Sequence, residues 1–139
     1  MARIDFHVLE DASPSAYLHY VCRLTEKAYT QGCHIHIHTA DQHMTEQLDE
    51  LLWVFRDRSF IPHQTNCADE DLCAVTLHHE DLPKQHEVLI NLASQVPSFY
   101  DQFERIVEVI ANEETHKQQG RERFRYYTEQ GQHPTHLKV

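Results

Sequence analysis

Three cationic side chains stand at a spacing suited to binding carboxylates. Lys117, Arg121 and Arg125 follow one another at intervals of four residues, so on a helix they share one face, with Phe124 beside them. A guanidinium group grips a carboxylate through two parallel hydrogen bonds, while an aromatic ring offers an apolar contact. This pattern fits a ligand that carries carboxylates and an apolar group. A solvated helix face, with cations near its C-terminus, is the other interpretation.

A second group of residues could bind a metal ion. Among 13 histidines, His34, His36 and His38 alternate along one short segment, so on a strand their imidazoles share one face. A His-x-His pair can bind zinc. The other interpretation is that Ile35 and Ile37 face the core and the histidines face another layer or solvent. We expect no metal site, because such sites draw ligands from several elements and the chain has no Cys-x-x-Cys pair.

The remaining reactive groups give little support to an enzyme. The glycines number three, and neither G-x-G-x-x-G nor G-x-x-x-x-G-K-[ST] occurs, so we expect no P-loop, no nucleotide and no other cofactor. The G-x-S-x-G motif of serine hydrolases does not occur in the sequence. The four cysteines are irregularly spaced, which favours reduced thiols over a disulfide framework; they are Cys22, Cys33, Cys67 and Cys73.

Alternating strands and helices are predicted to position these groups. Period-two patterns predict strands at 3–9, 34–38, 74–77, 88–91 and 105–111. Helical spacing predicts three helices, the first capped by Ser13 and Pro14 and stopped at Gly32, the second capped by Asp41 and ending near Trp53. The third is predicted from a cap at Asn112 to about Gln130. Residues 55–71 read as loop, and the tail 133–139 carries no clear element.

This order of elements predicts an α/β fold. A strand, a crossover helix and a strand in so few residues form a βαβ unit, which implies parallel pairing. We therefore expect one domain over residues 1–139, with a mostly parallel sheet between helices. Its length suits a single core, and its longest apolar runs fall far short of a membrane span. We expect a cytoplasmic protein without membrane contact.

The charge distribution is uneven. Formal net charge is −10, which disfavours nonspecific nucleic-acid binding by the whole surface. Four of the twelve Lys and Arg residues nevertheless lie within 117–125. Any association with DNA is therefore expected to be indirect.

Three segments together resemble the chi subunit family of bacterial DNA polymerase III. Residues 117–127 read Lys-Gln-Gln-Gly-Arg-Glu-Arg-Phe-Arg-Tyr-Tyr, similar to the family's last helix. Mid-chain, Leu48-Asp49-Glu50, Leu52-Trp53 and Ser59-Phe60-Ile61-Pro62-His63 follow the family's order, and residues 88–92 are similar to a later strand. One family position held by Tyr is Phe124 here, so a hydroxyl hydrogen bond is lost while stacking survives.

The resemblance implies a noncatalytic accessory subunit with a three-layer Rossmann-like fold. Family members pair with a small partner, psi, on the clamp loader, and bind the acidic, Phe-ended tail of single-stranded DNA-binding protein. Matched positions imply a tail site of Ile110, Lys117, Arg121, Phe124 and Arg125, and a psi site of Trp53, Phe60 and Pro62. The alternative is a small metal-dependent or nucleotide-handling enzyme that uses His34, His36 and His38.

Overall fold

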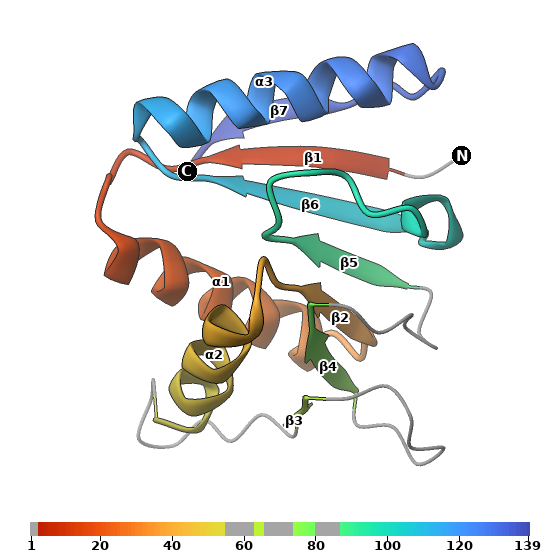
Figure 1. Cartoon of the computed structure of the whole chain (residues 1–139). Coiled ribbons are helices and arrows are strands. Elements are labelled where there is room, and N and C mark those ends of the chain that lie inside the picture. Colours follow the sequence, from red (N-terminus) through yellow and green to blue (C-terminus); the bar gives the residue numbers. More distant parts are fainter. Residues whose placement is uncertain (1–2, 55–62, 66–73, 80–86) are drawn as a thin grey trace.

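Strands and helices alternate along the chain in the computed structural model, which describes residues 3–54, 63–65, 74–79 and 87–139 (Figure 1). The elements are β1 (Arg3–Val8), α1 (Pro14–Thr30), β2 (Ile35–His38), α2 (Gln42–Val54), β3 (His63–Gln64), β4 (Val75–His78), β5 (Val88–Asn91), a 3₁₀ turn η1 (Tyr100–Gln102), β6 (Arg105–Ile110), α3 (Glu114–Glu129) and β7 (Thr135–Lys138). Among the described residues, none of the helices has the length and apolar character needed to cross a bilayer.

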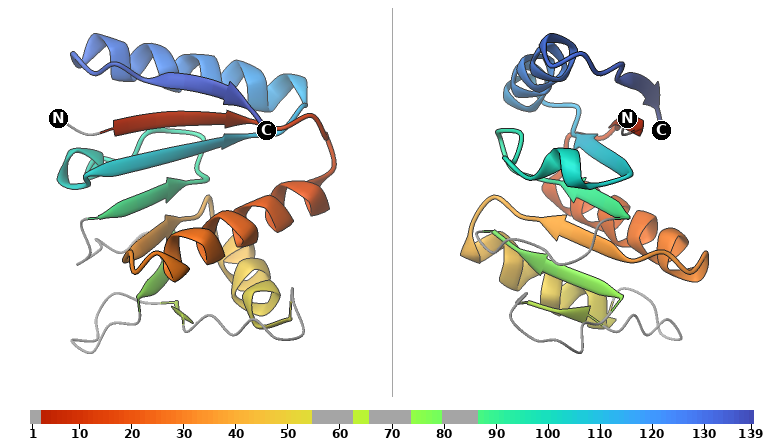
Figure 2. Two further views of the ribbon diagram at one scale, coloured as in Figure 1. Left: turned by 180° about the vertical axis from the view of Figure 1, so that it is seen from behind. Right: turned by 90° about the vertical axis from the view of Figure 1, so that its right-hand side faces the viewer.

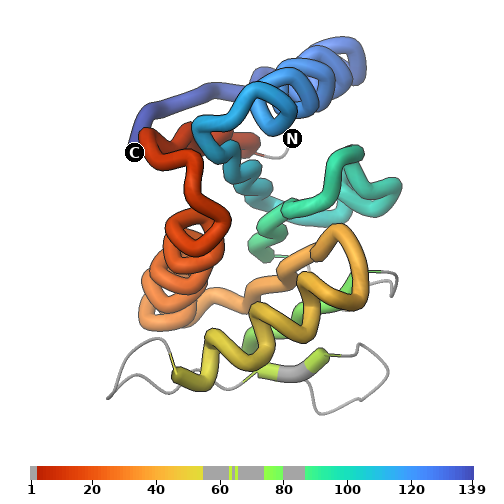
Figure 3. Tube along the Cα trace, turned by 60° about the vertical axis from the view of Figure 1, so that its left-hand side comes forward, coloured from red at the N-terminus to blue at the C-terminus, as the bar shows by residue number. Residues whose placement is uncertain are grey.

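The described strands form one sheet in the order β3-β4-β2-β5-β6-β1-β7, and every pairing between neighbours is parallel. Figure 3 shows α1 on one side of these strands and α3, with the segment that contains η1, on the other. The predicted α/β fold with a mostly parallel sheet is confirmed, and the layering is that of a three-layer Rossmann-like fold.

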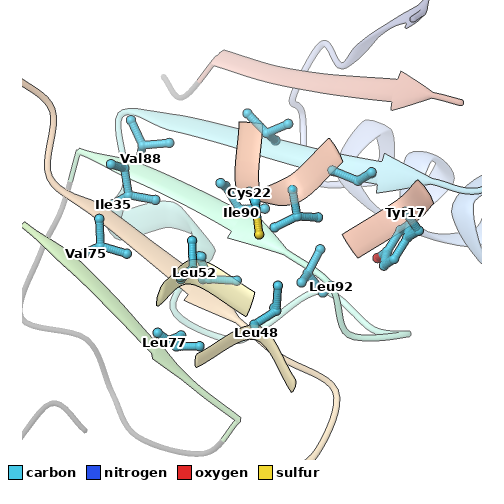
Figure 4. Packing of buried hydrophobic residues seen from close by; sticks show 14 of the residues in the cluster. Tyr17, Cys22, Ile35, Leu48, Leu52, Val75, Leu77, Val88, Ile90 and Leu92 are labelled. Atoms are coloured by element: carbon cyan, nitrogen blue, oxygen red, sulfur yellow. The ribbon is translucent and has the colours of Figure 1, made fainter. Parts of the chain in front are cut away.

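Each face of the sheet has its own apolar core. Ile35 and Ile37 of β2 pack with Leu48 and Leu52 of α2 and with the buried side of α1 (Figure 4). On the opposite face, a second cluster joins strands β1, β5 and β6 to the η1 segment and α3, with members Ile4, Phe6, Leu89, Phe99, Tyr100, Phe103, Ile106, Ile110 and Tyr127. The period-two alternation of strand side chains supplies both faces from the same strands.

The helix boundaries follow from local capping chemistry. The Ser13 hydroxyl accepts a hydrogen bond from the Ala16 amide at 3.3 Å, and the Asp41 carboxylate accepts one from the Met44 amide at 2.8 Å, as predicted. At α3 the predicted cap is wrong by one residue: Glu113 caps the helix, accepting from the amides at 115 and 116. Asn112 instead donates its side-chain amide to the Glu10 carbonyl.

Two strands contradict the sequence interpretation. The tail carries β7, which pairs in parallel with β1 from Asp5–Thr135 to Val8–Lys138 and forms an edge of the sheet. At the other edge, the two-residue strand β3 pairs with β4 inside the segment interpreted as loop. Both strands are short, and all four residues of β7 are exposed, so neither has an apolar run that could reveal it.

His36 is a fully buried histidine in the middle of the sheet. Its Nδ1 lies 2.8 Å from the Thr76 hydroxyl, and its ring packs against Phe99 and Phe103. Burial, followed by the charges of His38 and His78, lowers the pKa of His36 to about 3. The folded chain therefore keeps this imidazole neutral across the range in which an unfolded chain protonates it.

The protein should lose stability as the pH falls below 6.5. An unfolded His36 binds a proton there and the folded one does not, so the stabilisation is complete above pH 6.5 and declines toward pH 3. At pH 5 the loss from this residue alone is about 2 kcal/mol. Urea unfolding at pH 7.5 and pH 5 checks this: His36→Gln should reduce the difference, while the exposed neighbour variant His34→Gln should retain it. Equal pH dependence in His36→Gln and the unaltered chain would contradict the assignment.

A candidate functional site between helix α3 and the sheet edge

A pocket of about 480 Å³ opens where α3 packs beside the β1–β7 end of the sheet. Figure 2 shows α3 running along this end, with β7 and β1 next to it. The walls of the pocket, which we call the α3 pocket, come from β1, β6, α3 and β7. The lining residues are Phe6, Val8, Ile110, Lys117, Gly120, Arg121, Phe124 and His136.

The floor of the α3 pocket is apolar and aromatic. Phe6 and Ile110 are buried members of the second core cluster, while Val8 and Phe124 are partly buried and pack against it. The rings of Phe6 and Phe124 lie 5.3 Å apart with a tilt of 55°. Phe124 is partly buried and lines the concavity, where the exposed part of its ring can contact an apolar group.

Gly120 lets α3 approach this floor closely. A Cβ atom at Gly120 would lie 2.7 Å from Cδ1 and 3.3 Å from Cγ1 of Ile110. A larger residue would therefore press on Ile110 and reshape the bottom of the pocket. This contact is the structural reason for a glycine in the interior of a helix, where glycine costs about 1 kcal/mol relative to alanine.

Two cations stand at the rim. Lys117 and Arg121 line the pocket with Ile110 and Phe124, so four of the five predicted tail-site residues are brought together. Arg121 lies 3.9 Å from Glu114, but both side chains are well exposed, which makes this ion pair weak and leaves the guanidinium accessible. Arg125 is exposed on the same helix and is not among the lining residues.

Four lining residues were not predicted as site residues: Phe6, Val8, Gly120 and His136. Phe6 and Val8 belong to a predicted strand, but only the packing of α3 over β1 places them in the pocket. His136 lies on the unpredicted β7, with its ring 6.3 Å from that of Phe124. The period-two pattern of the first strand could have suggested Phe6 and Val8, whereas no local signal marks His136.

Arg123 faces away from the rim and into the protein. Its Nε donates to Oε1 of Glu108 at 2.8 Å, and its Nη1 donates to the carbonyl of Ser94 at 3.2 Å. The other Glu108 oxygen accepts from the Tyr127 hydroxyl at 2.8 Å and from the Asn91 amide at 2.9 Å. Glu108 is fully buried, so this network ties α3 to strands β5 and β6 through charge-assisted hydrogen bonds.

The network also sets the ionisation of its members. Burial raises the pKa of Glu108, while the Arg123 charge and the three donors oppose that shift. Burial raises the pKa of Tyr127 as well, and the nearby Glu108 carboxylate adds to the effect. Tyr127 therefore stays a hydrogen-bond donor to Glu108.

The predicted psi-site residues are only partly described. Trp53 lies in the last turn of α2 and is 44% exposed, with its ring 4.4 Å from that of His63. Val54 beside it is also exposed. Phe60 and Pro62 lie outside the described residues. The structure thus presents an apolar surface at the end of α2, on the opposite side of the molecule from β7 (Figure 1).

The histidine strand does not assemble a group of metal ligands. His34 is exposed, whereas His36 is buried and occupied with Thr76, and Ile35 and Ile37 face the core. Within the described residues, no three His, Cys, Asp or Glu side chains come together as metal ligands. The structure supports the interpretation in which the histidines face another layer or solvent: His36 and His38 pack against Phe99, and His34 is exposed.

The fold and the pocket define a class: an α/β protein whose described surface offers a basic-rimmed apolar pocket. Comparison with known proteins then gives the family. The family model described as DNA polymerase III chi subunit, HolC, matches residues 1–135. The DNA polymerase III subunit chi of Pseudomonas aeruginosa is 43% identical over 133 residues, covering 94% of this chain and 92% of that protein. The Escherichia coli subunit chi is 26% identical, covering 91% of each chain.

The chain belongs to the DNA polymerase III chi subunit family. The Haemophilus influenzae subunit chi is a further relative, 25% identical over 91% of this chain and 90% of that protein. The family is one of accessory subunits in DNA replication, and the resemblance read from the sequence is confirmed.

Proposed function

We propose that this chain is a noncatalytic bridge between the polymerase III clamp loader and single-stranded DNA-binding protein. One surface, the α3 pocket, binds the acidic C-terminal tail of single-stranded DNA-binding protein. A second surface at the end of α2 binds psi. Association with DNA is then indirect, through the tail.

The observation that carries the proposal is the composition of the α3 pocket. A peptide that ends in Phe and carries several acids needs an apolar well beside a cationic rim. Phe6, Ile110 and Phe124 supply the well, and Lys117 and Arg121 supply the rim. In a chain of net charge −10, such a cationic rim is locally complementary to an anionic peptide, while the acidic parts of the surface repel the peptide.

Arg125 has a separate role in this proposal. It lies one helical turn beyond Arg121 but outside the pocket lining. A tail with acids upstream of its last residue would pass along the helix surface, where Arg125 meets it as an exposed, screened charge. Its contribution should therefore be smaller than that of Arg121.

The psi surface rests on Trp53. Trp is over-represented among interface residues that dominate binding energy, and this one is substantially exposed in the isolated chain. Phe60 and Pro62 complete the proposed site by their match to the family pattern. Because α2 and the α3 pocket lie at different ends of the sheet, the two partners can bind together (Figure 1).

Reversing the charge of Arg121 should abolish tail binding at the α3 pocket. Arg121→Glu removes a charge-assisted contact worth about 1.5–3 kcal/mol and adds repulsion against the acidic peptide. Arg125→Glu should weaken binding by a smaller factor. Isothermal titration calorimetry with the tail peptide measures both.

The control is Gln47→Glu, which adds a negative charge to an exposed residue of α2 outside the α3 pocket. It should leave the affinity of this pocket unchanged. If Arg121→Glu and Gln47→Glu both bind the peptide at the α3 pocket with the affinity of the unaltered chain, Arg121 has no part in the site.

Removing the Trp53 side chain should weaken psi binding and leave the tail site intact. A central interface Trp typically costs at least about 2 kcal/mol when truncated, roughly a thirtyfold loss of affinity. Trp53→Ala is compared with Tyr126→Ala, which removes another exposed aromatic side chain, on α3. Psi capture by surface plasmon resonance that is equal for the two variants would exclude Trp53 as an anchor.

A further inference from the structure

A second groove lies on the other face of the β1–β7 end, beside α1. It encloses about 570 Å³ and is lined by residues of α1, β1, β6 and β7. Side chains alternate along β1, so Phe6 and Val8 line the α3 pocket while Arg3, Asp5 and His7 line this one. We call it the α1 groove. The two concavities are thus back to back across the same pair of strands.

The α1 groove concentrates positive charge. Among the described residues, four of the chain's twelve Lys and Arg residues line it, and Asp5 is the single acidic one; the cations are Arg3, Arg23, Lys27 and Arg105. Asp5 is already engaged, because its Oδ2 lies 3.1 Å from Arg3 and 3.6 Å from Arg105, and its Oδ1 accepts from the Thr135 hydroxyl. Arg23 and Lys27 stand exposed at the rim.

Buried polar atoms at the base of the groove have no hydrogen-bond partner among the described residues. His7 is only 7% exposed; its Nδ1 bonds to the Tyr20 hydroxyl, and its Nε2 is left without a partner. The buried Nε of Arg105 also has no hydrogen-bond partner among the described residues. An arginine N–H can only donate, and in the tautomer whose Nδ1 accepts from Tyr20, Nε2 of His7 donates too. The base therefore offers two donors to an oxyanion, next to the buried Oδ2 of Asp5, which forms ion pairs with Arg3 and Arg105 but has no hydrogen-bond partner among the described residues.

The walls of the groove suit a peptide better than a lone anion. Leu24, Val107 and Leu137 give it an aliphatic side, and Leu137 and Val139 are both more than 40% exposed. β7 pairs with β1 alone among the described strands, so its outer edge can accept an extended backbone. A single phosphate would fill only a small part of this space. Carboxylates together with apolar side chains would fill it.

We propose that the α1 groove docks a second acidic peptide tail of the kind that the α3 pocket binds. The identity of the peptide rests on the proposed function, whereas the groove itself does not. Carboxylates meet the donors of His7 and Arg105 at the base and the charges of Arg23 and Lys27 at the rim, while an apolar side chain packs on Leu24 and Leu137. One chain then holds two tails, one on each face of the β1–β7 end.

The test is a calorimetric titration of the full chain with the tail peptide. The unaltered chain should bind two peptides. Arg121→Glu should bind one, through the α1 groove, and Arg23→Glu combined with Lys27→Glu should also bind one, through the α3 pocket. The triple variant, with Arg121, Arg23 and Lys27 all changed to Glu, should bind no peptide. Arg23→Gln with Lys27→Gln, which only neutralises the rim, should weaken the groove site without repulsion.

Each failure identifies which proposal is wrong. If Arg121→Glu binds no peptide, the groove is not a tail site and the α3 pocket stands. If Arg121→Glu changes nothing and the Arg23 and Lys27 variant abolishes binding, the α3 site fails and the groove stands. If the triple variant still binds peptide, the proposal that the α1 groove is a tail site is wrong. If the unaltered chain binds oligothymidine but not the peptide, and Arg23→Glu with Lys27→Glu loses that binding, the α1 groove is a nucleic-acid site and the proposal is wrong.

Discussion

The buried contact between Glu108 and Arg123 determines how α3 lies on the sheet. Glu108 sits in the middle of β6 with no exposure to solvent, and its oxygens are satisfied by Arg123, Tyr127 and Asn91. Such a pair adds little net stability over an apolar contact, yet removing one partner is costly, so it selects one arrangement of the helix. Arg121 is two residues before Arg123, about 200° around the helix. Turning Arg123 inward therefore turns Arg121 outward, to the rim of the α3 pocket.

The parallel sheet explains why the two concavities lie where they do. α1 connects β1 to β2 and packs over the middle of the sheet, so it leaves part of β1 and β7 open on its own face. On the other face, α3 connects β6 to β7 across β1, and Gly120 brings it close to Ile110. β1, the strand next to the edge strand β7, is polar on one side and apolar on the other, which gives two different basic, apolar surfaces. Both suit acidic peptides, although the molecule as a whole is strongly acidic.

Most of the fold could be predicted from the sequence, because its signals are local. Caps at Ser13 and Asp41, the glycine stop at Gly32 with φ +82°, and period-two strands each depend on residues close in the chain. β7 could not be predicted, since its strand conformation depends on pairing with β1, some 130 positions earlier. Helical spacing placed Lys117, Arg121 and Phe124 together for the same local reason. It could not show that Arg125 lies outside the pocket or that His136 completes it, because those facts depend on the position of the sheet edge.

The most direct measurement is the effect of Arg123→Met on α3 and on tail binding, because Arg123 does not line the α3 pocket. Breaking the buried pair should destabilise the protein by about 3–5 kcal/mol, since Glu108 is left without its counter-charge. Amide hydrogen exchange should speed up through residues 114–129, and affinity for the tail peptide should fall. Tyr127→Phe, which removes a single bond to Glu108, should do both to a smaller degree, and Glu122→Gln on the exposed face should do neither. Unchanged exchange in α3 and unchanged tail affinity in Arg123→Met would contradict the view that this pair holds the pocket in place.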